Sequence, residues 1–177
     1  MRELFVMDLK NYDEDAPRFR RPSVRGILWK AHQLAMVYSR KYDYYKFPGG
    51  GIEAGESHET ALIREVQEET GLQIIPGSVK AYGSVLRIQK STCREHEIFE
   101  QENYYYFCDA QTAPGSRNLD GYERDEGFTL VYVTPEHARR VNRLHDHKGY
   151  DSILIEREAK VLELLETEQR SGADAVS

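Results

Sequence analysis

Short apolar runs rich in branched and aromatic residues, separated by turn residues, predict several β-strands along the chain. Val24 to Trp29 and Gln33 to Tyr38 predict the two strands of a hairpin. The stretch 11–23 before them is polar and contains two prolines, which predicts a loop. Further strands are expected at 72–75, 78–88, 103–109 and 128–133.

A helix is predicted after a glycine-rich loop. Pro48 and the glycines at 49–51 end any regular element, because Pro cannot complete a strand ladder and Gly adopts backbone angles that other residues resist. Ser57 can then cap a helix that runs to about Thr70, and Gly71 ends it.

Two more helices are expected in the last third of the chain. A capping hydroxyl, a proline and an acid at 134–136 predict a helix that ends near Leu144. The segment 152–168 predicts a closing helix, because its apolar residues fall on one stripe. We expect a single domain over 1–169, with a frayed polar tail at 170–177.

Composition and charge narrow the classes of function. The 177 residues include 24 Lys and Arg against 30 Asp and Glu, a net charge of −6, which disfavours general binding to nucleic acid or to an acidic membrane. The longest apolar runs have five residues, far below the roughly 20 of a membrane helix. With no signal-peptide pattern and no disulfide expected between Cys93 and Cys108, a soluble cytoplasmic protein is predicted.

The acids at the end of the first helix carry the chemical signal. Helical spacing places Glu65, Glu68 and Glu69 on one face, beside the core-facing residues. An acid-rich helix is most often only a solvated face. Here, however, the spacings create like-charge pairs, and two acids lie at the negative end of the helix dipole. Arg64 can relieve one contact, whereas a divalent cation could stabilise the whole set.

The ligands available to such a cation are oxygens. Carboxylate and carbonyl oxygens suit Mg²⁺ or Mn²⁺ and make a structural zinc site unfavourable. Mg²⁺ that keeps open water positions is well suited to gripping phosphate oxygens. The stretch therefore predicts a phosphate-containing substrate.

The residues Gly50, Glu56 and Arg64-Glu65-Val66-Gln67-Glu68-Glu69-Thr70-Gly71-Leu72 resemble a complete Nudix box. The resemblance implies an α/β/α sandwich around a mixed sheet, and hydrolysis of a nucleoside diphosphate linked to another group. It also implies that Glu65, Glu68 and Glu69 bind Mg²⁺ or Mn²⁺ together with the Gly50 carbonyl, and that Arg64 and Glu56 brace the loop and the helix.

Other residues are candidates for the proton acceptor and for substrate binding. The base is expected to be Glu65 or an acid from one of two loops, Glu97 to Glu102 or Glu123 to Glu126, with Glu123 and Glu126 slightly preferred. Arg25 and Lys46 are candidates for gripping the distal phosphate or sugar, and Lys46, next to the glycine loop, is the stronger one.

Three functions stay open. The first is a Mg²⁺-dependent hydrolase of a small nucleotide diphosphate such as a nucleotide sugar, and the second is a nucleoside triphosphate pyrophosphatase of the housecleaning type. The third is a nucleotide-binding regulatory module without catalysis. Residues 86–90 carry neither the Pro that would indicate ADP-ribose nor the Tyr that would indicate dinucleoside polyphosphates in this family. The expected partner is a small nucleotide, and a homodimer is compatible with the sequence.

Overall fold

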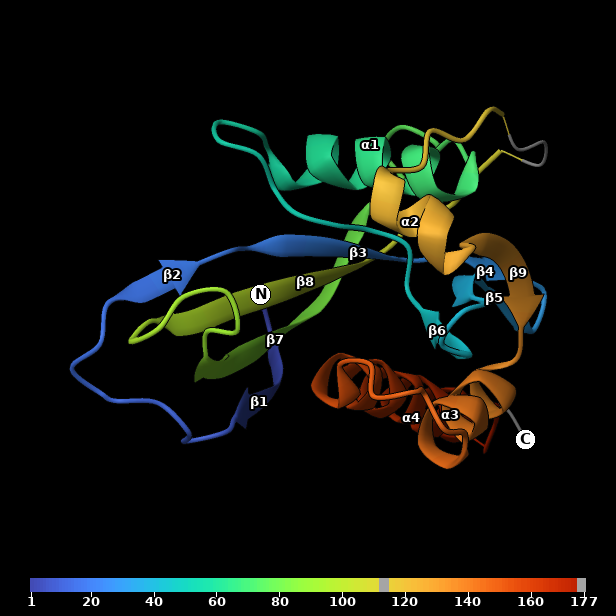
Figure 1. The fold of residues 1–177 in the computed structure, drawn as a ribbon. Coiled ribbons are helices and arrows are strands. Elements are labelled where there is room, and N and C mark those ends of the chain that lie inside the picture. Colours follow the sequence, from blue (N-terminus) through green and yellow to red (C-terminus); the bar gives the residue numbers. More distant parts are fainter. Residues whose placement is uncertain (112–114, 175–177) are drawn as a thin grey trace.

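Two β-sheets lie between a longer and a shorter helix on one side and two helices on the other (Figure 1). The computed structural model describes residues 1–111 and 115–174. This layering confirms the expected α/β/α sandwich. The helices are α1 (His58–Thr70), α2 (Gly121–Glu126), α3 (Pro135–Leu144) and α4 (Ser152–Asp174).

The larger sheet is mixed, and its central strands form a long antiparallel hairpin. Its strands are β1 (Glu3–Asp8), β2 (Arg18–Arg20), β3 (Ser23–Ile27), β7 (Lys80–Lys90) and β8 (Ile98–Phe107). β7 and β8 pair antiparallel, β1 adds parallel to β7, and β2 and β3 both add parallel to β8. In this register Arg25 lies beside Tyr105, on the sheet face that turns toward α4.

In the smaller sheet, one strand pairs with each of the other three. β5 (Gln33–Ser39) pairs antiparallel with β4 (Trp29–Lys30), β6 (Tyr44–Lys46) and β9 (Thr129–Val133). β6 leads directly into the glycine-rich loop, so this sheet sets where the loop begins.

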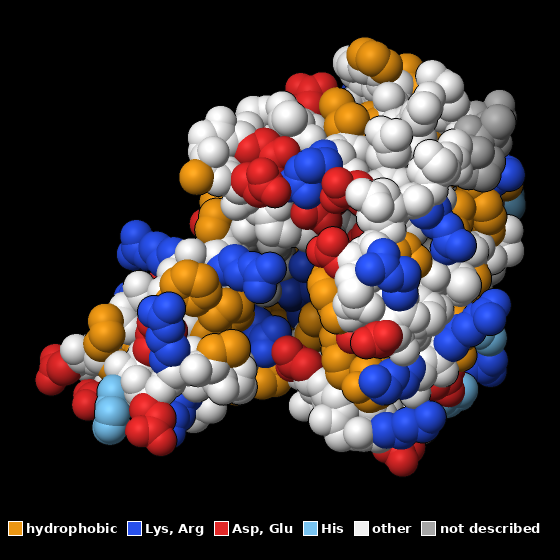
Figure 2. All heavy atoms as spheres, turned by 45° about the horizontal axis from the view of Figure 1, so that its top comes forward, with side chains coloured by type: hydrophobic (Ala, Val, Ile, Leu, Met, Phe, Trp, Pro, Cys, Tyr) orange, Lys and Arg blue, Asp and Glu red, His pale blue; other side chains and the backbone are white. Residues whose placement is uncertain are grey.

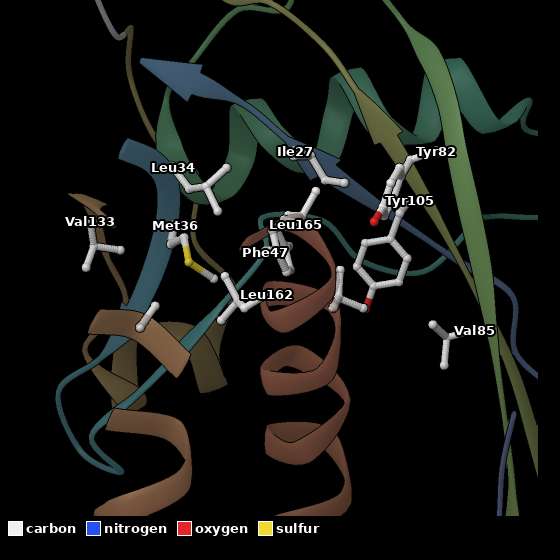
Figure 3. Close-up of a cluster of buried hydrophobic side chains, with 12 residues drawn as sticks. Ile27, Leu34, Met36, Phe47, Tyr82, Val85, Tyr105, Val133, Leu162 and Leu165 are labelled. Carbon is white, nitrogen blue, oxygen red and sulfur yellow. The ribbon is translucent and has the colours of Figure 1, made fainter. Parts of the chain in front are cut away.

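Two apolar cores fix these layers. The first lies between the sheets and α4, where Leu162 and Leu165 face Phe47 and Tyr105 (Figure 3). The second lies under α1 and includes Leu62 and Val66 with residues of β3 and β5. Among the described residues, no helix combines the length and apolar character needed to cross a bilayer.

Several elements differ from the sequence predictions. β1 and β6 were not predicted, β2 forms inside the stretch expected to be a loop, and α2 forms where a charged loop was expected. The predicted strand at 72–75 is wrong, because only Ile74 makes a bridge, to Ala110. The last helix continues to Asp174, and 175–177 of the expected tail lie outside the described residues. The two cysteines are free.

Candidate active site

Helix α1 presents the acids of the motif. Ser57 accepts a hydrogen bond from the Thr60 N–H, and the Gly71 N–H closes the other end on the Gln67 carbonyl at 2.8 Å. Gly71 has a φ of 76°, a left-handed conformation that favours glycine. Both predicted caps are therefore confirmed, and they fix which face of α1 meets the core.

Arg64 holds the glycine loop and the helix together. Its guanidinium donates to both oxygens of Glu56, at 2.8 and 2.9 Å, and to the Gly51 carbonyl at 3.1 Å. The same group donates from Nη1 to Glu65 at 2.7 Å and to Glu68 at 3.3 Å. Hydrogen bonds from Arg64 hold the pKa of Glu56 below its ordinary value. One arginine thus connects three carboxylates with the loop backbone.

The Glu65 carboxylate lies against the backbone of Gly50. A Cβ added at Gly50 would lie 2.2 Å from Glu65 Oε2, so only glycine permits this approach. The Gly50 carbonyl accepts the Val24 N–H at 2.9 Å, which leaves one of its two lone pairs for another ligand.

Glu69 turns away from the other two acids and into the protein. It is 1% exposed, and its two oxygens accept from Lys46 Nζ at 2.5 Å and from the Gly49 N–H at 2.8 Å. Burial raises the pKa of Glu69 to about 7, while Lys46, the Gly49 N–H and Arg25 oppose the shift. Partial burial also raises the pKa of Glu68.

Arg25 supplies a cationic group beneath the loop. Its Nη1 donates to the Gly49 carbonyl, and the residue is 7% exposed. Its Nε is buried and has no hydrogen-bond partner among the described residues. Arg25 therefore keeps an unused donor close to the glycine loop.

The loop acids have structural partners. Glu123 accepts the Asp120 N–H at 2.7 Å and so completes a capping box of α2. Glu126 accepts from the hydroxyls of Tyr44, at 3.2 Å, and Ser39, at 3.3 Å. In the other acidic stretch, Glu100 forms ion pairs with two arginines of β2.

Helix α2 nevertheless lies beside α1 (Figure 1). The Asn118 N–H, just before α2, donates to the Glu68 carbonyl at 2.9 Å. Desolvation, followed by the charges of Glu123, Glu69 and Glu65, raises the pKa of the Tyr122 hydroxyl. The structure therefore brings the acidic stretch at 123–126 close to the motif, as part of a helix.

Two residues on α4 that support the glycine loop were missed by sequence reasoning. Glu158 is fully buried and accepts the Phe47 N–H at 2.8 Å, at the start of the glycine loop. Arg157 donates to Glu158 at 2.5 and 3.0 Å and to Asn103 at 2.8 Å. The signal was present, because Glu158 falls on the same helical stripe as Ile155 and Leu162, where a charge is unexpected.

The oxygens around Arg64 fit a hard divalent cation. Glu65 and Glu68 each use one oxygen on Arg64, and neither Glu65 Oε2 nor Glu68 Oε1 has a hydrogen-bond partner within the described chain. The remaining lone pair of Gly50 adds a third oxygen donor, the ligand type that Mg²⁺ prefers. Among the side chains described, those of 1–111 and 115–169, however, no three His, Cys, Asp or Glu converge as a group that could hold a metal ion.

Open space adjoins these residues. A pocket of about 500 Å³ lies between α1 and residues 116–118, and Arg64 and Glu68 are part of its lining. Figure 2 shows a hollow with Lys and Arg side chains on its walls, next to a group of Asp and Glu side chains. A negatively charged ligand would find both cationic groups and carboxylates there.

Comparison with known proteins gives a family match and a shared fold. The family model described as NUDIX domain matches residues 19–154. An RNA pyrophosphohydrolase of Cellvibrio japonicus is 48% identical over 61 residues, 33% of this chain and 35% of that protein. A putative 8-oxo-dGTP diphosphatase of Bacillus subtilis is 25% identical over 122 residues, 66% of this chain and 73% of that protein.

Solved structures agree on the fold. A NUDIX hydrolase from Nitrosomonas europaea has a TM-score of 0.53 at 17% identity, covering 78% of this chain and 85% of that one. A MutT NUDIX hydrolase from Burkholderia pseudomallei has a TM-score of 0.50 at 14% identity, covering 67% of this chain and 85% of that one.

Proposed function

The chain belongs to the NUDIX family, and we propose that it is a pyrophosphohydrolase that cleaves a phosphoanhydride bond of a nucleoside triphosphate with the help of Mg²⁺ or Mn²⁺. The names of its relatives, 8-oxo-dGTP diphosphatase and RNA pyrophosphohydrolase, favour nucleoside polyphosphates over the nucleotide sugars placed first from sequence. The segment shared with the RNA pyrophosphohydrolase spans 35% of that protein. The substrate in that protein's name therefore supports the proposal less than the family match does.

One observation carries this proposal: Arg64 gathers Glu65 and Glu68 beside the glycine loop. Its contacts of 2.7 and 3.3 Å leave one oxygen of each acid free, and Glu65 lies directly against Gly50. Arg64 is a single positive charge shared by these two acids and Glu56, so the cluster keeps a net negative charge that a further cation would relieve. The arrangement is therefore suited to a divalent cation and a phosphate chain.

The bound cation and the residues of the site have different roles in the proposed hydrolysis. When bound, the cation would lower the pKa of the attacking water and neutralise charge on the leaving phosphate. Glu65, Glu68 and the Gly50 carbonyl would hold it, and the buried guanidinium of Arg25 would add positive charge beneath the loop. Glu123 and Glu126 are engaged in holding α2, which narrows the proposed proton acceptor to the carboxylates of α1.

A substrate panel tests the proposal. The purified protein with Mg²⁺ would be offered dNTPs including 8-oxo-dGTP, NDP-sugars, ADP-ribose, dinucleoside polyphosphates and a short 5′-triphosphorylated RNA. Pyrophosphate would be assayed as phosphate with and without added inorganic pyrophosphatase. For NDP-sugars, ADP-ribose and dinucleoside polyphosphates, alkaline phosphatase would be added instead, because it releases phosphate from the phosphomonoester products and not from these intact substrates. We expect nucleoside triphosphates to release pyrophosphate, whereas preferred turnover of NDP-sugars would contradict the proposal.

A matched pair of variants separates catalysis from binding alone. Glu65→Gln should lower turnover by at least about 100-fold without a loss of folding. Glu59→Gln, an exposed acid in the first turn of the same helix, should leave turnover unchanged. A wild-type protein that binds nucleotide but turns over none of the panel would instead indicate the non-catalytic module.

A further inference from the structure

We propose that the ammonium group of Lys46 takes the place of a divalent metal ion at the carboxylate of Glu69. The divalent cation of this chain would then be held by Glu65, Glu68 and Gly50 alone. The proposal rests on the proposed function, because it concerns which cations balance the negative charge of the same site. It changes the expectation from the family motif that all three acids bind metal.

Each oxygen of Glu69 already accepts one hydrogen bond, and burial of the side chain keeps the remaining lone pairs away from solvent. Lys46 Nζ lies 2.5 Å from Oε1, and the Gly49 N–H lies 2.8 Å from Oε2. The side chains of Lys46 and Glu69 are only 10% and 1% exposed. A buried carboxylate needs a counter-charge, and the ammonium group supplies it within the protein.

Neighbouring elements hold Lys46 in this position. Its Nζ lies 4.9 Å from the ring centroid of Phe128, which follows α2. Its backbone belongs to β6, where it pairs with Val37 of β5. The ammonium group is thus held between a sheet, an aromatic ring and Glu69, and a metal ion would have to displace it to reach this carboxylate.

The other two acids of α1 are in a different situation. The side chains of Glu65 and Glu68 are 14% and 36% exposed, and each meets Arg64 through a single oxygen. Together with Glu56, the three acids carry four negative charges, and the two cations paired with them, Lys46 and Arg64, neutralise two. Two negative charges remain beside the loop, and one divalent cation balances them.

Counting Mn²⁺ in the absence of nucleotide tests this proposal. Free Mn²⁺ would be measured by electron paramagnetic resonance during titration of the wild-type protein and four variants. The key variant is the neutral double replacement Lys46→Met with Glu69→Gln, which keeps the size of both side chains and leaves no buried charge unpaired. Glu65→Gln and Glu68→Gln are the comparisons, and Lys46→Met alone is the fourth variant.

We expect one tight Mn²⁺ in the wild-type protein. The double variant should bind the same number with an affinity within about threefold, whereas Glu65→Gln and Glu68→Gln should each lose at least about tenfold. Lys46→Met alone should bind an additional Mn²⁺, and Mn²⁺ should raise its melting temperature more than that of the wild type.

Two results would overturn the proposal. One is a double variant that loses Mn²⁺ as strongly as Glu65→Gln, because Glu69 would then be a metal ligand. The other is a folded Lys46→Met protein with unchanged Mn²⁺ number and affinity. Neither measurement uses a nucleotide, so a failure here is distinct from a failure to hydrolyse the substrate panel.

Discussion

The buried ion pair of α4 allows a quantitative test of how the glycine loop is supported. The side chains of Arg157 and Glu158 are 1% and 0% exposed. Glu158 accepts the Phe47 N–H through Oε2, at 2.8 Å, and Arg157 through Oε1. The Tyr105 hydroxyl also donates to Oε1, at 3.4 Å. In Glu158→Gln the amide offers one acceptor and one donor, and neither the Phe47 N–H nor Arg157 can accept a hydrogen bond. One contact must therefore be lost, and Arg157 keeps its charge without a counter-ion.

The expected loss of stability is large. Breaking a buried pair by removing one partner costs about 3 to 5 kcal/mol. In a domain of this size, 1 kcal/mol corresponds to about 2 to 4 °C, so the melting temperature should fall by roughly 6 to 20 °C. Removing both charges in Arg157→Met with Glu158→Gln should restore much of the loss, because no charge is left buried alone.

Thermal and urea unfolding measure this effect against a matched control. Glu166 of α4 pairs with Arg139 of α3 at 2.7 Å, with side chains 12% and 26% exposed. Glu166→Gln should cost less than about 1 kcal/mol, because a partly exposed pair is screened by solvent. If Glu158→Gln is no more destabilising than Glu166→Gln, the buried pair does not support the fold as described.

Three further predictions follow from single contacts. Gly50→Ala should weaken Mn²⁺ binding at least about tenfold with little change in melting temperature, because the new methyl would lie 2.2 Å from Glu65 Oε2; unchanged binding would contradict this geometry. Ellman's reagent should titrate only the exposed Cys93 in the native protein, because burial raises the pKa of Cys108 to about 12; equal rates for both thiols would show that Cys108 is accessible. The guanidinium beside Glu56 lowers the pKa of that carboxyl from 4.5, so its stabilising effect is complete above about pH 4.5 and is lost as the pH falls through the lower folded value. Glu56→Gln should therefore flatten the acid side of a plot of melting temperature against pH, and an unchanged slope would exclude this linkage.

Local signals explain which elements could be predicted from the sequence. Ser57 and Gly71 bound α1 through contacts within one turn, and Thr134 caps α3 in the same way. The spacing of the acids on α1 likewise needs only helical geometry. The identity of the motif residues was therefore accessible without knowledge of the tertiary structure.

Other elements depend on distant partners and left weak local signals. β2 is a three-residue segment, Arg-Phe-Arg, that becomes a strand only because it pairs with β8. The branched residues at 72–75 suggested a strand, but only Ile74 meets another strand-like segment. The pairing of Lys46 with Glu69 arises because β6 passes α1, and spacing along the chain does not encode this approach.

The long-range contacts of the site also bear on how the chain acquires its activity during synthesis. The Phe47 N–H donates to Glu158, which lies 111 residues later in the chain. Strand β3 pairs in parallel with β8, some 80 residues away. Such connections close slowly because chain entropy must be lost before any contact forms. A ribosome-bound fragment that ends before α4 therefore carries the whole acidic motif but lacks the anchor of its loop, so cation binding should emerge only after the closing helix has left the exit tunnel.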